Sequence, residues 1–356
     1  MTKAPRLSRV LLTVLFVACA LEGGARLFFL ATSRLVPDPR AKAAGYAGAE
    51  WPAEFFRELR AAPVRWHPYI TWKQARFTGQ HLNVNEEGDR ATWQGDAIEA
   101  DLPTVVMVGG STVFGVGSRD DQTLPSAVAR HLVNSSEPAR VHNFGQVGYV
   151  TSQDLIHLQL HLRAGLRPDV VVFYGGAGDV VAAWQSGVAG VPQNEENRAV
   201  EFNAGQPASV GSAWRIATSG TRRLLGALTA IPREEDAAAT RALATEVVAS
   251  YAADLRAARA LAVEYGFELV AVWQPVSPTP RFATMWPLYE ETRAALRDGA
   301  VVPASVRWVD LAGVIAAESP MFIDAFHVTE EGNAALAAAL APVVASLLAG
   351  RRPQTP

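Results

Sequence analysis

The chain has 356 residues, enough for one large domain or two modest ones, and its 49% hydrophobic and 19% charged residues are ordinary for a globular protein. Its net charge of −3 lacks the basic excess that binding to a phosphate backbone requires, so we expect no nucleic-acid partner. The single cysteine, Cys19, excludes an intrachain disulfide and a four-cysteine zinc site.

The N-terminus predicts a membrane anchor. It begins with three basic residues, Lys3, Arg6 and Arg9. The apolar run from Val10 to Ala31 would span roughly 33 Å as a helix, enough to cross a bilayer core. Glu22 and Arg26 lie four apart and can pair on one helix face near the outer boundary. Because the basic residues come first, we expect residues 1–31 to be a signal anchor, with the rest of the chain periplasmic or extracellular.

Two other interpretations of this segment stay open. Ala18 and Ala20 have the spacing of small residues found at signal-peptide cleavage sites, so the leader could be removed. Cys19 could instead be the lipidated residue of a lipoprotein signal, although Phe16 is bulky for such a site. All three interpretations place the remaining chain outside the cytosol.

The rest of the chain divides into three parts. Residues 32–100 are rich in aromatics and are expected to cover a larger domain, or alternatively to form an aromatic wall for a sugar or lipid. Over 101–351 strands alternate with helices, which predicts a doubly wound, flavodoxin-like parallel sheet of about five strands with helices on both faces. Residues 352–356 are a tail.

The apolar runs and their flanking residues give the expected elements of this domain. The strands are 104–108, 140–144, 168–174, 267–273 and 307–311, and the helices are 123–132, 152–166, 236–265 and 329–348. The polar stretch 180–211 is expected to be a loop or lid.

Polar residues gather where these strands end, the edge at which open α/β sheets bind ligands. Ser111 follows the first strand, and glycine-rich turns with free amides follow the second and third. Asp324 and His327 lie after the fifth strand, three residues apart, so that both side chains can project to one side. A serine, a histidine, a carboxylate and backbone amides are the components of nucleophilic acyl transfer.

Other interpretations of the stretch 109–117 fit less well. A P-loop needs a lysine after its last glycine, and a dinucleotide fingerprint needs a glycine spacing that is lacking here. A nucleophile elbow of the Gly-x-Ser-x-Gly type fails at Val113. Ser111 taken alone could simply cap the following helix.

Taken together, these residues resemble the SGNH (GDSL-like) hydrolase family, in its membrane-anchored cell-envelope branch. Three blocks carry the resemblance: Gly109-Gly110-Ser111, the Asn-x-Gly-x-x-Gly of Asn143, Gly145 and Gly148, and the Asp-x-x-His of Asp324 and His327. Upstream, Asn85-x-x-Gly88-x-Arg90 also looks like this branch.

The resemblance implies a mechanism and a substrate class. Ser111 would attack an ester carbonyl, His327 would move the proton, and Asp324 would orient the imidazole. The amides of Ser111 and Gly148 would bind the oxyanion. The implied substrates are O-acyl esters, often acetyl, of envelope carbohydrate or lipid, by hydrolysis or acyl transfer and without a cofactor.

One oxyanion position departs from the family pattern. The family's Gly-x-Asn-Asp block has Gly178 in place of its asparagine. Loss of one such donor typically costs about 10²–10³ in rate, so Gly178→Asn is expected to raise ester hydrolysis. The rival hypothesis is a non-catalytic protein that binds acylated glycan or a membrane partner.

His157 and His161 lie four apart on an expected helix and raise the question of zinc. The sequence shows neither an adjacent Glu nor a clear third ligand, so we expect no metal there.

Overall fold

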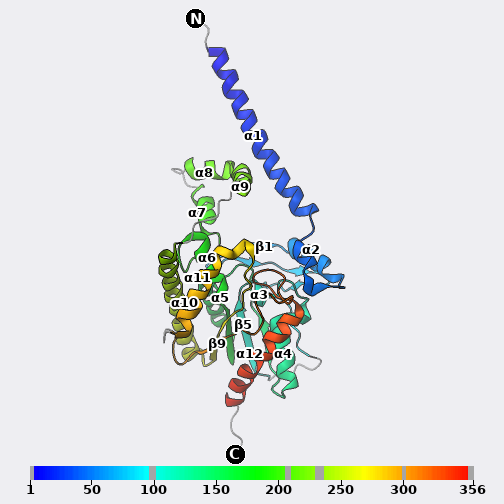
Figure 1. The fold of residues 1–356 in the computed structure, drawn as a ribbon. Helices are drawn as coiled ribbons and strands as arrows, with labels where there is room; N and C mark the ends of the chain where they lie inside the picture. Colours follow the sequence, from blue (N-terminus) through cyan, green and yellow to red (C-terminus); the bar gives the residue numbers. More distant parts are fainter. Residues whose placement is uncertain (1–3, 96–101, 205–209, 229–235, 299–301, 352–356) are drawn as a thin grey trace, which may run out of the picture. The chain divides into compact units, whose positions relative to one another are not determined.

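The computed structural model describes residues 4–95, 102–204, 210–228, 236–298 and 302–351 (Figure 1). The chain forms two compact units. The first consists of Met1–Pro37 and Asn194–Glu234, and the second of Asp38–Gln193 and Glu235–Pro356. Lys3 and the expected tail, 352–356, lie outside the described residues.

A parallel sheet with strand order β6-β5-β7-β8-β9 forms the centre of the second unit. Its strands are β5 (Thr104–Gly109), β6 (Arg140–Asn143), β7 (Val170–Gly175), β8 (Glu268–Trp273) and β9 (Arg307–Asp310). The first strand therefore lies between the second and third, as in flavodoxin-like folds. The expected fold is confirmed, and each strand lies within two residues of its predicted range.

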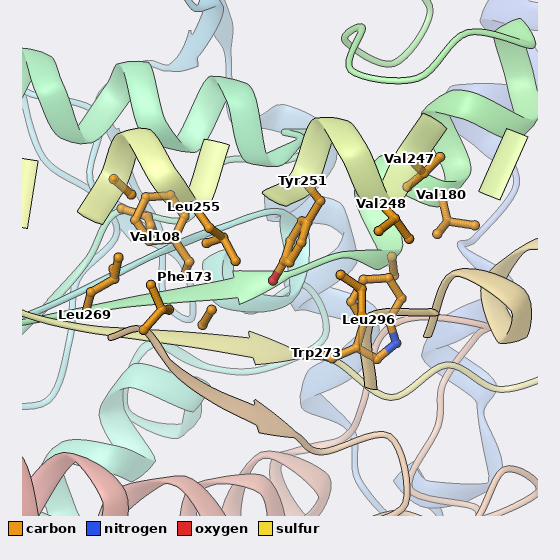
Figure 2. Packing of buried hydrophobic residues seen from close by; sticks show 14 of the residues in the cluster. Val108, Phe173, Val180, Val247, Val248, Tyr251, Leu255, Leu269, Trp273 and Leu296 are labelled. Atoms are coloured by element: carbon orange, nitrogen blue, oxygen red, sulfur yellow. The ribbon is translucent and has the colours of Figure 1, made fainter. Parts of the chain in front are cut away.

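Helices cover both faces of this sheet, because successive strand residues point to opposite sides. One face carries α5 (Thr151–Arg163), α6 (Ala177–Ser186), α10 (Ala237–Tyr265) and α11 (Trp286–Asp298). The other carries α4 (Leu124–Asn134) and α12 (Glu330–Arg351). Figure 2 shows the first face, where Tyr251 and Leu255 of α10 pack over Phe173 and Trp273 of the strands.

The expected loop at 180–211 was wrong for residues 180–186, 195–204 and 210–211, which are helical. Residues 177–186 form α6, and Val180 and Ala183 are fully buried in the core beneath α10. The short apolar run after Asp179 has helical spacing, and burial of this face stabilises the helix. Further along, α7 (Glu195–Ala204), α8 (Val210–Ala217) and α9 (Ser219–Leu228) belong to the first unit.

Residues 38–95 pack on the sheet domain through aromatic side chains. Their elements are η1 (Pro39–Lys42), η2 (Ala44–Tyr46), α2 (Trp51–Ala61), β1 (Val64–His67), β2 (Thr71–Gln74), β3 (Phe77–Thr78) and β4 (Asn83–Val84). Phe55 and Phe56 are buried in a cluster with Phe114 and Ile323 of the sheet domain. These contacts favour the cover interpretation over an aromatic substrate wall.

The buried guanidinium of Arg90 joins this cover to the sheet domain. It donates to the Asp120 carboxylate at 2.9 Å and to the carbonyls of Phe114, Gly115 and Ser118 at 2.6–2.8 Å. The rings of Phe55 and Phe114 lie against it. Its backbone also bridges Val84 and Asn143, which connects the cover to β6.

The first unit is built on α1 (Ala4–Leu35). The span Arg9–Thr32 is long and apolar enough to cross a membrane and is only 6% buried. Helix α12 is also long and apolar enough to cross a membrane, but 44% of its apolar stretch is buried, and its side chains pack against the sheet. As expected, Arg26 pairs with Glu22, with Nε 2.6 Å from Oε1.

We predict that Arg90→Leu lowers the free energy of unfolding by about 3–5 kcal/mol, because it removes a buried cation from the partly buried Asp120 carboxylate and from three carbonyls. Urea unfolding of the full chain in detergent measures this. The matched control is Arg57→Leu, which removes a 68%-exposed side chain paired with Glu54, and should cost at most about 1 kcal/mol. Equal losses in the two variants would contradict a structural role for Arg90.

Candidate active site

The structure brings Ser111, Asp324 and His327 into one hydrogen-bonded chain. Ser111 opens the short helix α3 (Ser111–Phe114) directly after β5, and the other two lie in the turn before α12. His327 Nε2 is 2.7 Å from Ser111 Oγ. On the other side of the ring, Nδ1 is 2.7 and 2.8 Å from the two carboxylate oxygens of Asp324.

The charge of Asp324 fixes which imidazole nitrogen carries the proton. Burial raises the pKa of Asp324, but the His327 ring and the backbone amides of Phe326 and His327 outweigh it and hold this pKa well below its usual range. An ionised carboxylate only accepts hydrogen bonds, so Nδ1 is the donor. The Nε2 lone pair therefore faces the Ser111 hydroxyl, which is the arrangement of a general base beside a nucleophile.

A cation that sequence reasoning missed adjoins this carboxylate. Arg40 Nη1 lies 3.5 Å from Asp324 Oδ2, while Asp38 holds the same guanidinium at 2.9–3.0 Å. Arg40 is 284 residues away from Asp324 in the chain, and no local pattern marks it as part of the site.

The three expected oxyanion positions, Ser111, Gly148 and Gly178, line the same cavity. Among the described residues the Gly148 amide donates to no other backbone group. Ser111 and Gly178 lie in the first turns of α3 and α6, where amides lack intrahelical acceptors. Gly145 lets β6 approach α3 closely, since a Cβ there would lie 2.1 Å from the Phe114 nitrogen.

The space in front of Gly178 is filled by backbone. A Cβ built on Gly178 would lie 2.6 Å from the carbonyl oxygen of Tyr149. Glycine therefore allows the turn that contains Gly148 and Tyr149 to lie against the start of α6. Gly178 itself offers the cavity a backbone amide and no side-chain amide.

The cavity beside the triad has a volume of about 400 Å³. Apolar side chains form part of its wall: Leu59, Val64, Val147, Val181, Phe282 and Phe326. The polar part includes Arg40 and four glutamines, Gln74, Gln185, Gln193 and Gln274. Gln274 is held in place by Thr112, whose hydroxyl donates to its side-chain oxygen at 3.1 Å. This mixture of apolar wall and a few fixed polar groups is typical of a small-molecule site.

Two buried carboxyl residues, Asp154 and Asp179, also line this cavity. Asp179 accepts hydrogen bonds from the Thr151 amide at 3.1 Å and from its hydroxyl at 2.8 Å, which ties the start of α6 to the start of α5. Burial raises the pKa of Asp179 to about 6. Burial and the charge of Asp179 raise the pKa of Asp154, which also lines the cavity, well above its usual value.

The structure supplies the third group that the zinc interpretation of His157 and His161 lacked. Their Nε2 atoms are 3.0 Å apart, and Asp89 places a carboxylate within 4.8 Å of both. Lys73 already serves as the cation here, with Nζ 3.0 Å from Asp89 and 3.4 Å from His161. Burial lowers the pKa of His157 well below its usual value and that of His161 to about 4. The cluster thus contains a largely buried ion pair of Lys73 and Asp89, and burial favours the neutral form of both imidazoles.

Comparison with known proteins gives one family. Residues 105–340 match the family described as GDSL-like Lipase/Acylhydrolase. Among curated proteins, none matches the chain.

Several solved structures are similar at low sequence identity. A lipase from a goat rumen metagenome is 13% identical with a TM-score of 0.44, over 69% of this chain and 98% of its own. A lipase/acylhydrolase from Enterococcus faecalis is 15% identical with a TM-score of 0.38, over 72% and 100%. An acetyl xylan esterase is 12% identical with a TM-score of 0.39, over 68% and 99%.

We predict that Asp179→Asn changes how stability depends on pH. The folded-state pKa of Asp179 lies above its unfolded value, so its contribution to stability is present at low pH and is lost as pH rises through about 6. The variant lacks this titration. Its Tm minus the wild-type Tm should therefore be more positive at about pH 7.5 than at about pH 5.

The control for this experiment is Asp298→Asn, at an exposed carboxyl group. Its Tm difference should vary little between the two pH values. If Asp179→Asn behaves like this control, the Asp179 carboxyl does not titrate differently in the folded protein.

Proposed function

Because the chain belongs to the GDSL-like lipase/acylhydrolase family, a family of ester-hydrolysing enzymes, we propose that it is a serine esterase or acyltransferase. Its substrates in this proposal are O-acyl esters, often acetyl, of cell-envelope carbohydrate or lipid. One observation carries the proposal: Ser111 and His327, which form a hydrogen-bonded chain with Asp324, line a cavity that the Gly148 backbone also lines.

The proposed reaction proceeds through an acyl-enzyme. Ser111 Oγ attacks the ester carbonyl carbon while His327 Nε2 takes its proton, and Asp324 stabilises the imidazolium that forms. The amides of Ser111, Gly148 and Gly178 stabilise the oxyanion. The imidazolium then protonates the leaving alcohol. Water or a second hydroxyl, activated by His327, attacks the acyl-enzyme and frees Ser111, so hydrolysis and transfer differ only in the acceptor.

The dimensions and lining of the cavity suit an ester with a short acyl group. About 400 Å³ lies at the small end of ligand pockets, and its apolar wall can receive an acyl chain. The glutamine side chains offer both donors and acceptors, as a carbohydrate hydroxyl requires.

We also propose that α1 anchors the protein, with the second unit periplasmic or extracellular. The support is the exposed apolar span Arg9–Thr32, together with the basic residues that come before it. An anchored enzyme would meet envelope substrates at the membrane surface.

A second candidate function is a non-catalytic protein that binds acylated glycan or a membrane partner. Gly178 favours it, since one oxyanion side-chain donor is lost. The intact hydrogen-bonded chain at Ser111 favours the enzyme.

We predict that Ser111→Ala, His327→Ala and Asp324→Ala each lower kcat/KM on a short-chain aryl ester by about 10⁴-fold or more, and that the triple variant loses little beyond the worst single variant. Residues that act as one unit are non-additive in this way. The protein should also react with a fluorophosphonate probe, and this labelling should disappear in Ser111→Ala.

The control for labelling is Ser346→Ala, on α12 outside the cavity, which should label like wild type. Wild-type protein that folds but neither reacts with the probe nor cleaves any ester would favour the binding function. Full activity in Ser111→Ala would contradict the mechanism.

The structure changes the expected effect of Gly178→Asn. Any side chain at this position must displace the Tyr149 carbonyl, and with it the neighbouring Gly148 amide. We therefore predict that Gly178→Ala and Gly178→Asn both lower Tm and lower kcat/KM by at least about tenfold, because oxyanion donors act only at the correct distance. The control is Gly313→Ala, at an exposed glycine without positive φ where nothing lies within 4 Å of the added Cβ. Higher activity in Gly178→Asn would contradict this prediction. It would show that the turn at Gly148 and Tyr149 can move aside and that the wild-type site lacks an oxyanion donor.

A further inference from the structure

The charged pair on α1 contacts a second segment of the first unit. Glu22 accepts hydrogen bonds from the Gly220 and Thr221 amides, both at 2.8 Å. Arg26 donates to the Ile216 carbonyl at 2.8 Å and to the Ser219 hydroxyl at 3.2 Å. The segment is the corner at which α8 ends and α9 begins.

These contacts satisfy the backbone groups that helix ends leave without partners. The Gly220 and Thr221 amides lie in the first turn of α9, and the Ile216 carbonyl lies in the last turn of α8. In water such groups are solvated, but in lipid they need a protein partner. Glu22 and Arg26 supply partners of both kinds, a carboxylate for the amides and a guanidinium for the carbonyl.

Close backbone packing accompanies the hydrogen bonds. Gly220 is buried, and a Cβ there would lie 2.9 Å from Arg26 Cγ and 3.2 Å from the Arg26 backbone nitrogen. A glycine that allows close helix approach is typical of helix contacts within membranes.

The position of the pair along α1 gives its depth. Arg26 and Glu22 lie six and ten residues before Thr32, the outer end of the apolar span, which is about 9 and 15 Å along a helix. If the span crosses the bilayer, both side chains lie in the outer leaflet. A charge at that depth is costly unless it is paired and hydrogen-bonded.

Large apolar side chains on α7 and α8 are exposed. Trp214 and Ile216 of α8 are 65% and 37% exposed, and Phe202 of α7 is 73% exposed. Helix α1 is exposed in the same way, since its residues Val10 to Leu30 include apolar side chains that are 47–74% exposed.

We propose that α8 and α9 form a second membrane element, a helical corner that lies in the outer leaflet against α1, with Trp214 and Ile216 in contact with lipid. Glu22 and Arg26 hold it there. This inference rests on the proposed anchoring of α1 and is independent of catalysis. Lipid thus covers the exposed apolar side chains of α1 and α8.

The single native cysteine allows both proposals to be tested separately. Cys19 lies exposed on α1 and takes a spin label in the wild-type chain. In a Cys19→Ser background, Trp214→Cys places the label on α8, and Arg297→Cys places it on an exposed charged position of α11 as the aqueous control. The full-length protein is reconstituted in vesicles of phosphatidylethanolamine and phosphatidylglycerol. Collision rates with oxygen, which partitions into lipid, and with a water-soluble nickel complex then report depth.

We expect an oxygen-to-nickel ratio at position 214 close to that at Cys19 and well above that at position 297. A water-exposed label at 214 with a lipid-exposed label at Cys19 would overturn the inference and leave the anchor intact. Water exposure at both positions would overturn the anchor as well. Ester hydrolysis assayed on the same vesicles tests the catalytic proposal independently.

Variants of the contact test what holds the corner in place. Gly220→Leu should move the label at position 214 toward water while the label at Cys19 stays in lipid, because the added side chain separates α9 from Arg26. Glu22→Ala should act in the same direction. The control is Gly24→Leu on α1, where nothing lies within 4 Å of the added Cβ. Unchanged depth at position 214 in both Gly220→Leu and Glu22→Ala would contradict the role of this contact.

Discussion

The buried guanidinium of Arg90 is the interaction on which the arrangement of the second unit depends. A cation removed from water needs acceptors on all sides, and here the loop after Ser111 supplies three carbonyls while Asp120 supplies the charge. The loop must keep one conformation to do so, and that conformation fixes the end of α3, the one-turn helix that begins at Ser111. The backbone of Arg90 also bridges Asn143. A residue of the cover segment therefore contacts both the loop after Ser111 and the strand that leads to Gly145 and Gly148.

Local signals in the sequence were enough to predict the sheet and the meeting of Ser111, Asp324 and His327 at one edge of it. Each strand is an apolar run that ends at a glycine or a polar turn, and the long helix α10 has its cap at Asp236 and its stop at Gly266. Parallel strands bring their carboxyl ends to one edge, so Ser111 and His327 were expected to meet although 216 residues separate them. Given that these three residues follow strands, their residue types alone were enough to suggest nucleophilic acyl transfer.

Contacts between distant segments could not be predicted, because no local pattern encodes them. Arg40 reaches Asp324, and Lys73 fills the cluster of Asp89 and His161, only through the packing of the cover. The pairing of Glu22 with Arg26 follows from helical spacing, but their shared partner, the α8–α9 corner, comes from almost 200 residues later. Helix α6 was missed for another reason: its buried face is short, and the polar residues that follow obscured its periodicity.

The departure at Gly178 is best understood together with its neighbours. Without a side chain at 178, the turn that contains Gly148 packs directly on α6, and Asp179 holds the same turn through Thr151. Under the proposed mechanism the oxyanion donors are then backbone amides, whose positions are set by these contacts. Backbone donors in a fixed turn need no reorganisation during the reaction, which is the physical basis of electrostatic stabilisation. Replacing Gly178 with asparagine alone would add a side-chain donor and displace the backbone turn that contains Gly148. An asparagine can therefore help only if this turn is changed together with residue 178.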